Sequence, residues 1–151
     1  MTSKDIQEVF RQHYKYRFNY TGLFEFEITE NYTSCRFDAI IIHAHRQYIQ
    51  GFEFKVSRID FLNDLHNGKW KKYLQYCHSF LWACPESLIQ PDEIELPAGL
   101  MWICPNEKTD DHYLKIIKKP KRIIPSPDIE LLQKILFLFA SRAKNRSGDY
   151  F

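Results

Sequence analysis

The residues best able to do chemistry in this sequence are Asp38 and the short motif Glu53-Phe54-Lys55. Side chains alternate between the two faces of a β-strand, so Glu53 and Lys55 are expected to project together, away from the apolar residues around them. Charged groups are rare in a strand otherwise suited to burial unless they are paired or functional. An acid on one strand and a Glu-x-Lys on the next can converge on a divalent metal, which is an arrangement suited to phosphodiester cleavage.

Asp38 is conspicuous because residues 37–42 are otherwise apolar on both faces. Such a run is typical of a central strand that is covered on two sides. A carboxylate there must be paired or ligated, and the alternative to a metal is a buried ion pair with Arg36 or Lys55. For Glu53 and Lys55 the alternative is a plain ion pair between neighbours on one face of an edge strand.

The elements that would position these residues follow from the spacing of apolar side chains. Helical spacing predicts a first helix that is capped by Ser3 and ends near Arg17. Alternation predicts strands at 23–29, 37–43 and 48–56, with the last two paired as a hairpin around residues 45–47. In the first of these strands Phe24, Phe26 and Ile28 are expected on one face. The later runs predict a helix from 57 that is interrupted at 67–68, strands at 79–84, 100–104 and 113–117, and a last helix that starts at 126–128.

The 151 residues fit one domain, 1–151, with strands and helices in an order that predicts a compact α/β sandwich of mixed strand direction. The net charge is only +2, so nucleic-acid binding would have to come from local basic patches. The densest basic run, residues 115–122, is either a solvated face or a phosphate contact. His43 and His45 are expected at the surface of a hairpin tip.

The four cysteines form no C-x-x-C pair, which indicates reduced and mostly buried thiols. A structural zinc site built from Cys77, Cys84, Cys104 and a histidine is a weaker alternative. No apolar run is long enough to cross a bilayer, and nothing resembles a cleavable signal. A cytoplasmic protein with no membrane partner is therefore expected.

In order and spacing, several segments resemble the PD-(D/E)XK nuclease superfamily, and within it the MmcB family of DNA-repair-associated nucleases. The resemblance runs from about residue 27 to residue 103, and its segments are Arg36-Phe37-Asp38, Phe52-Glu53-Phe54-Lys55-Val56-Ser57, Asp60-Phe61-x-x-Asp64, Lys69-Trp70-x-x-Tyr73, Phe80-Leu81-Trp82-Ala83-Cys84-Pro85 after Cys77, and Leu96-Pro97-x-Gly99-Leu100. It implies a restriction-endonuclease-like α/β sandwich, in which a central mixed β-sheet is flanked by helices with an αβββαβ core.

The resemblance also implies a metal site. Asp38 and Glu53 would be the ligating carboxylates, and the backbone carbonyl of Phe54 would complete the protein ligands. Hard oxygen ligands suit Mg²⁺ or Mn²⁺ and leave positions for water and phosphate. Glu27 would be a further acid of the site, with Glu25, one strand period away, left open. Glu27 as an ordinary solvent-facing residue is the alternative.

Further roles follow from the same resemblance. Lys55 would orient or help to deprotonate the attacking water and offset charge on the phosphate. Lys69 and Tyr73, with Ser57 and Lys72, would contact nucleic acid.

Two departures from the family pattern stand out. Phe37 replaces a proline, and residues 65–68 lengthen the connection that precedes Lys69. Asp60 and Asp64 are expected to cap and solvate a helix rather than to join the site.

The function expected from these features is a metal-dependent deoxyribonuclease that hydrolyses phosphodiester bonds, an endonuclease being one form, in DNA repair, recombination or defence against foreign DNA. DNA is the expected partner, with a homodimer or a larger repair or defence complex as further assemblies. The alternative is a catalytically silent nuclease-fold module that binds DNA or a partner protein.

Overall fold

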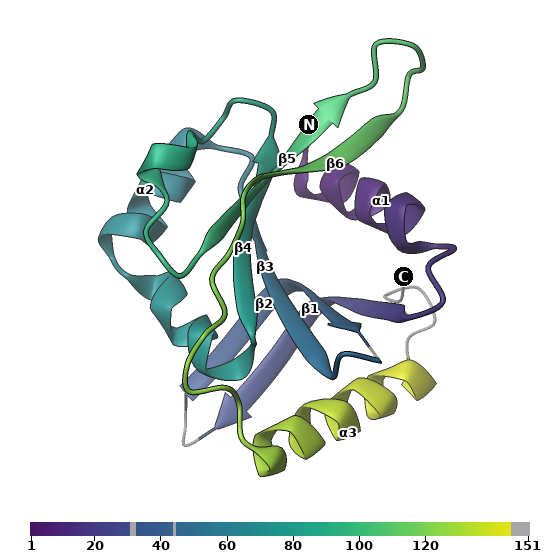
Figure 1. Ribbon diagram of the computed structural model, residues 1–151, viewed down its shortest axis with the longest axis vertical. Coiled ribbons are helices and arrows are strands. Elements are labelled where there is room, and N and C mark those ends of the chain that lie inside the picture. The colour runs from purple at the N-terminus through teal and green to yellow at the C-terminus, as the bar shows by residue number, and fades with distance from the viewer. Residues whose placement is uncertain (31–32, 44, 146–151) are drawn as a thin grey trace.

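The computed structural model describes residues 1–30, 33–43 and 45–145, and shows a six-stranded sheet with helices on both faces (Figure 1). The strands are β1 (Tyr20–Glu30), β2 (Thr33–His43), β3 (Tyr48–Phe54), β4 (Ser79–Pro85), β5 (Gly99–Pro105) and β6 (His112–Lys118). The helices are α1 (Ser3–Tyr14), α2 (Arg58–His66), the 3-10 helices η1 (Lys69–Tyr76) and η2 (Pro91–Glu93), and α3 (Ile129–Asn145).

The strands lie in the sheet in chain order, from β1 at one edge to β6 at the other. The first three strands pair antiparallel, β3, β4 and β5 pair parallel, and β6 returns antiparallel. Parallel pairing of β3 with β4 requires a crossover, which α2 and η1 supply. The prediction of an α/β fold with a mixed sheet is confirmed.

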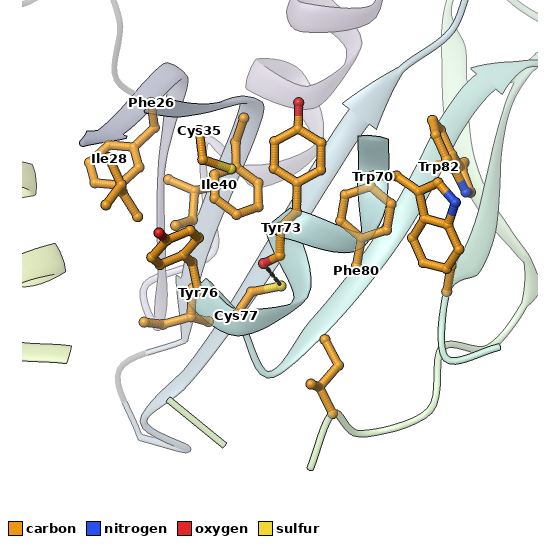
Figure 2. Packing of buried hydrophobic residues seen from close by; sticks show 14 of the residues in the cluster. Phe26, Ile28, Cys35, Ile40, Trp70, Tyr73, Tyr76, Cys77, Phe80 and Trp82 are labelled. Carbon is orange, nitrogen blue, oxygen red and sulfur yellow. Dashed lines mark hydrogen bonds between the residues drawn. The ribbon is translucent and has the colours of Figure 1, made fainter. Parts of the chain in front are cut away.

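Two hydrophobic clusters cover the two faces of this sheet. On one face, Phe10 of α1 packs against Phe52 and Phe54, with ring centroids 5.1 Å and 5.0 Å away. On the other face, the cluster includes residues of α2, η1 and α3. There Tyr73 stacks on Phe80 at a centroid distance of 5.5 Å, and Figure 2 shows the Tyr73 hydroxyl pointing away from the cluster. Burial on both faces explains why β4 reads as an almost continuous apolar run.

The alternation of side chains between the two faces of the sheet is interrupted in β1 at Glu25, whose backbone φ is 51°. Before it, Phe24 packs in the cluster of α1, whereas Phe26 and Ile28 pack in the opposite cluster. The expected placement of these three side chains on one face is therefore wrong. The register is continuous across the break, with Phe24 opposite Ala39 and Phe26 opposite Phe37. A non-glycine residue in the left-handed region is uncommon. Glu25 lies across from Asp38, between the paired residues Phe24–Ala39 and Phe26–Phe37.

The helix ends differ in detail from the sequence-based expectations. Thr2, not Ser3, caps α1 in a capping box with Asp5, and the helix ends at Tyr14 rather than near Arg17. At α3 the Asp128 carboxylate accepts the Leu131 N–H at 2.8 Å, so the helix begins after the expected start.

Between Lys69 and Tyr76 the chain forms a 3-10 helix rather than a continued α-helix. Its buried residues Trp70, Tyr73 and Tyr76 recur every third position, which matches three residues per turn. All four cysteines are buried and free, as predicted. None of the helices in the described ranges is both long and apolar enough to span a membrane.

Close packing beneath β3 leads to a stability prediction for Gly51→Ala. An added Cβ would lie 2.4 Å from Cε1 of Phe37, a fully buried ring. We expect the free energy of unfolding to fall by about 1–3 kcal/mol, as for other overpacked cores. Urea denaturation followed by circular dichroism measures this loss. In the double variant Gly51→Ala with Phe37→Leu, the clash is reduced and part of the loss should be restored; an additive further loss would contradict the packing argument.

Candidate active site

A polar cavity of about 370 Å³ lies where β1, β2 and β3 meet α2 and η1. We call it the polar pocket, and its lining residues are Glu27, Ser34, Arg36, Asp38, Glu53, Asp64, Lys69, Lys72 and Tyr73. Six of the residues expected at the site from the sequence are among them. The fold therefore brings together side chains that lie up to 46 positions apart in the chain.

Asp38 fixes the relation between β2 and the end of β3. Its Oδ2 accepts the backbone N–H of Phe54 at 2.7 Å. Burial raises the pKa of Asp38, and the charge of Glu25 adds to this, while the Phe54 N–H, Lys55 and Arg36 act in the opposite direction. Arg36 itself forms an ion pair with Glu25 at 3.3 Å. Asp38 is thus held by a backbone donor in a place that disfavours its charge.

Glu53, Lys55 and Asp64 form a charge cluster at the end of β3, in which Glu53 and Lys55 are buried and Asp64 is partly exposed. The Lys55 Nζ lies 3.2 Å from Oε1 of Glu53 and 2.5 Å from Oδ2 of Asp64. Lys55 is 7% exposed and Glu53 9% exposed, and the ammonium also lies 5.5 Å from the centroid of the Trp82 ring. The expected placement of Glu53 and Lys55 on one face is confirmed by this contact.

Lys55 keeps its proton in this environment. Burial alone would lower the pKa of Lys55, but Glu53 and Asp64 outweigh burial and leave that pKa raised. A lysine with a raised pKa is a poor base at neutral pH. The side chain is therefore suited to offsetting negative charge and orienting a bound group, and not to deprotonating water.

For Glu53, in contrast to Lys55, burial outweighs the partner of opposite charge and disfavours the charged form. Burial raises the pKa of Glu53 to about 7, and the charges of Asp38 and Asp64 contribute, although Lys55 opposes the shift. Its Oε2 is buried and accepts no hydrogen bond. Burial raises the pKa of the Tyr73 hydroxyl, and the Glu53 carboxylate beside it adds to this shift. A buried carboxylate oxygen without a hydrogen-bond donor is uncommon, and a bound water or ion can supply the missing partner.

The orphan oxygen, Oε2 of Glu53, raises the question of whether the polar pocket fits a divalent cation. Within residues 1–30, 33–43 and 45–145, no group of three or more Asp, Glu, His or Cys side chains is arranged to hold a metal. Asp38 and Glu53 both line the polar pocket, and two carboxylates together with several waters are a ligand set that Mg²⁺ commonly takes. Cys77, Cys84 and Cys104 form no metal-binding group with a histidine in the part of the chain that the structure describes.

The other sequence-predicted residues divide into two groups. Glu27 lines the polar pocket and accepts a hydrogen bond from Ser34, whereas Glu25 is paired with Arg36 outside it. Lys69, Lys72 and Tyr73 all line the pocket. Ser57 sits before α2 as its N-cap and is not among the lining residues, so its nucleic-acid contact stays a prediction.

Asp64 is a residue of the polar pocket that sequence reasoning placed elsewhere. It was expected to cap and solvate a helix, yet it contacts Lys55 from α2. The signal that could have found it is the position of an acid on the helix directly after the Glu-x-Lys motif, two turns into that helix. Asp60, one turn earlier, is exposed and remains a solvated acid.

Comparisons with known proteins show the fold and no more. No family model and no curated protein matches this chain. Among solved structures, the SPO1766 protein of unknown function from Silicibacter pomeroyi is similar, with a TM-score of 0.74 and 19% sequence identity. The match covers 97% of this chain and 88% of that one.

The raised pKa of Glu53 predicts a pH-dependent stability. Between its ordinary value of 4.5 and about 7, the folded protein binds more protons at Glu53 than the unfolded chain does. Glu53 therefore lowers the free energy of unfolding as pH rises through this window. We expect the free energy of unfolding of Glu53→Gln, taken relative to wild type, to be higher at pH 8 than at pH 5 by roughly 1–3 kcal/mol.

Urea denaturation at both pH values measures this difference. The exposed acid Glu107, changed to Gln, is the control and should show no such trend. A Glu53→Gln difference that does not vary with pH would contradict the shifted titration.

Proposed function

We propose that this protein is a metal-dependent deoxyribonuclease that hydrolyses phosphodiester bonds at the polar pocket. The observation that carries the proposal is the Glu53 carboxylate, buried beside Asp38, with an orphan oxygen and with Lys55 at its other oxygen. Groups whose charge is disfavoured by their surroundings gather at functional sites. DNA repair, recombination or defence against foreign DNA are the processes we associate with this activity.

The order of elements supports a relation to the PD-(D/E)XK nucleases. A helix, three antiparallel strands, a helical crossover and a parallel fourth strand follow one another here, as in the αβββαβ core of that superfamily. The residues that the resemblance assigns to the site, Glu27, Asp38, Glu53 and Lys55, lie at or beside one pocket in this arrangement. Fold alone does not decide function, so the proposal depends on these side chains.

The chain's own residues supply binding and charge compensation. Asp38, Glu53 and the Phe54 carbonyl would hold Mg²⁺ or Mn²⁺. When bound, such an ion polarises phosphoryl oxygens and lowers the pKa of bound water. Lys55, kept protonated by its two carboxylates, would stabilise negative charge on the phosphate. Lys69 and Lys72 at the pocket rim would hold neighbouring phosphates.

A nuclease-fold module that binds DNA or a partner protein without cleaving is the second candidate. It is favoured by the lack of a three-carboxylate metal group among the residues that the structure describes. The two candidates differ in their products: only the first converts supercoiled plasmid to nicked or linear DNA in the presence of Mg²⁺ or Mn²⁺.

The cleavage prediction concerns Asp38→Asn and Lys55→Ala. We expect plasmid cleavage by the wild type with Mg²⁺ or Mn²⁺. The cleavage rate should fall about 100-fold or more in each variant, because Asp38 would hold the metal and Lys55 would stabilise the negative charge of the transition state. Lys119→Ala, an exposed lysine outside the pocket, is the matched control. Cleavage at the wild-type rate by a folded Asp38→Asn or Lys55→Ala protein would refute the assigned roles.

Asp64→Asn tests whether Asp64 positions Lys55. The amide keeps an oxygen that can accept from Lys55 but removes the charge that holds the ammonium. We expect a loss of roughly 10-fold to 100-fold in cleavage rate, the usual cost of removing a partner of a functional group. Asp60→Asn, one helical turn away on α2 and exposed, should cleave like wild type. Equal rates for both variants would leave Asp64 with a structural role only.

A further inference from the structure

A second cavity, of about 1050 Å³, lies between η1, residues 121–128 and the first half of α3. We call it the basic groove. Its charged lining consists of four basic residues, Lys71, Lys121, Arg122 and Lys134, and two acidic ones, Asp128 and Glu130. The Asp128 carboxylate accepts the Leu131 N–H at the start of α3, and Lys71 is ion-paired with Glu95 at 3.3 Å, which leaves Lys121, Arg122 and Lys134 as the other cations of the lining. The groove therefore presents an excess of positive charge in a chain whose net charge is only +2.

The backbone that carries Lys121 and Arg122 is fixed in place. The Lys121 N–H donates to the Pro97 carbonyl at 2.9 Å, and the Ile123 N–H donates to the His78 carbonyl at 2.9 Å. Both basic side chains are exposed. Cations on an anchored backbone lose less freedom when they bind an anion than cations on a mobile loop do.

The basic groove and the polar pocket each contribute a lysine that contacts the β1–β2 hairpin near its end. Lys72 of the polar pocket donates to the Ser34 carbonyl at 3.2 Å, and Lys134 of the groove donates to the Thr29 carbonyl at 3.3 Å. Thr29 and Ser34 are directly opposite each other in the two strands. Lysines from the two cavities thus contact carbonyls of one directly opposed residue pair, which places the cavities on neighbouring parts of the molecule.

We propose that the basic groove binds the phosphates of a single-stranded polynucleotide segment that continues from the polar pocket. Its volume is of the size that holds a drug-sized ligand, which suits a few nucleotides of one strand rather than two paired strands. A positively charged groove that follows the backbone is a usual feature of single-strand binding, and apolar side chains beside it offer surface against which bases can pack. Leu74 and Ile124 provide such apolar contacts here.

This inference rests on the proposed function only for the location of the scissile bond. Binding can be measured without cleavage, by fluorescence anisotropy of a labelled oligodeoxythymidine of about 12 nucleotides in the presence of a chelator, over a range of salt concentrations. We expect Lys121→Ala with Arg122→Ala to weaken binding at least about 10-fold, and to reduce the slope of log affinity against log salt by about 1.4.

The control is Lys108→Ala with Lys115→Ala, which removes the same charge from exposed positions outside the groove. An equal loss in the two double variants, or tighter binding of a duplex of the same length that the groove variant does not affect, would overturn the proposal. Loss of binding in the groove variant while wild type fails to cleave plasmid would refute the nuclease proposal alone. Normal cleavage with unchanged binding in that variant would refute the groove alone.

Discussion

The buried Lys55 ammonium constrains the arrangement of everything around it. A charge this deep in the protein must be compensated, and removing one partner of such a group typically costs several kcal/mol. Its two partners come from different elements, Glu53 from β3 and Asp64 from α2, so α2 must turn back directly after β3. That turn leads into η1 and the parallel pairing of β4, whose Trp82 packs against the same ammonium.

Two carboxylates of the polar pocket lie where burial disfavours their charge. The Lys55 ammonium contacts Glu53 and Asp64, while burial raises the pKa of both Asp38 and Glu53. The charge of Asp38 adds to the raised pKa of Glu53, so keeping both carboxylates ionised costs free energy. A bound cation would relieve this cost, and the lysines at the rim and along the basic groove would attract the anion that accompanies it. In the proposed function, the metal, the phosphate contacts and the groove would be parts of one electrostatic arrangement.

The sequence predicts a residue's position well where its local pattern agrees with its burial in the fold. It predicts the position poorly where contacts between distant elements determine it. Asp38, Glu53 and Lys55 could be found because a charge in an apolar strand is conspicuous by type alone. Asp64 could not, because an acid on a helix looks solvated until the fold places Lys55 beside it. The exchange of strand faces at Glu25 depends on a left-handed backbone that no local pattern in β1 indicates, and the 3-10 form of η1 is visible only as a spacing of three.

The central claim is that the buried carboxylates of the polar pocket hold a divalent cation, and calorimetric titration of the metal-free protein with Mn²⁺ tests it most directly. We expect one Mn²⁺ per chain, binding that is lost in Glu53→Gln, and binding that is retained in Asp60→Asn. No heat of binding in the folded wild type, or equal affinity in Glu53→Gln, would contradict the account.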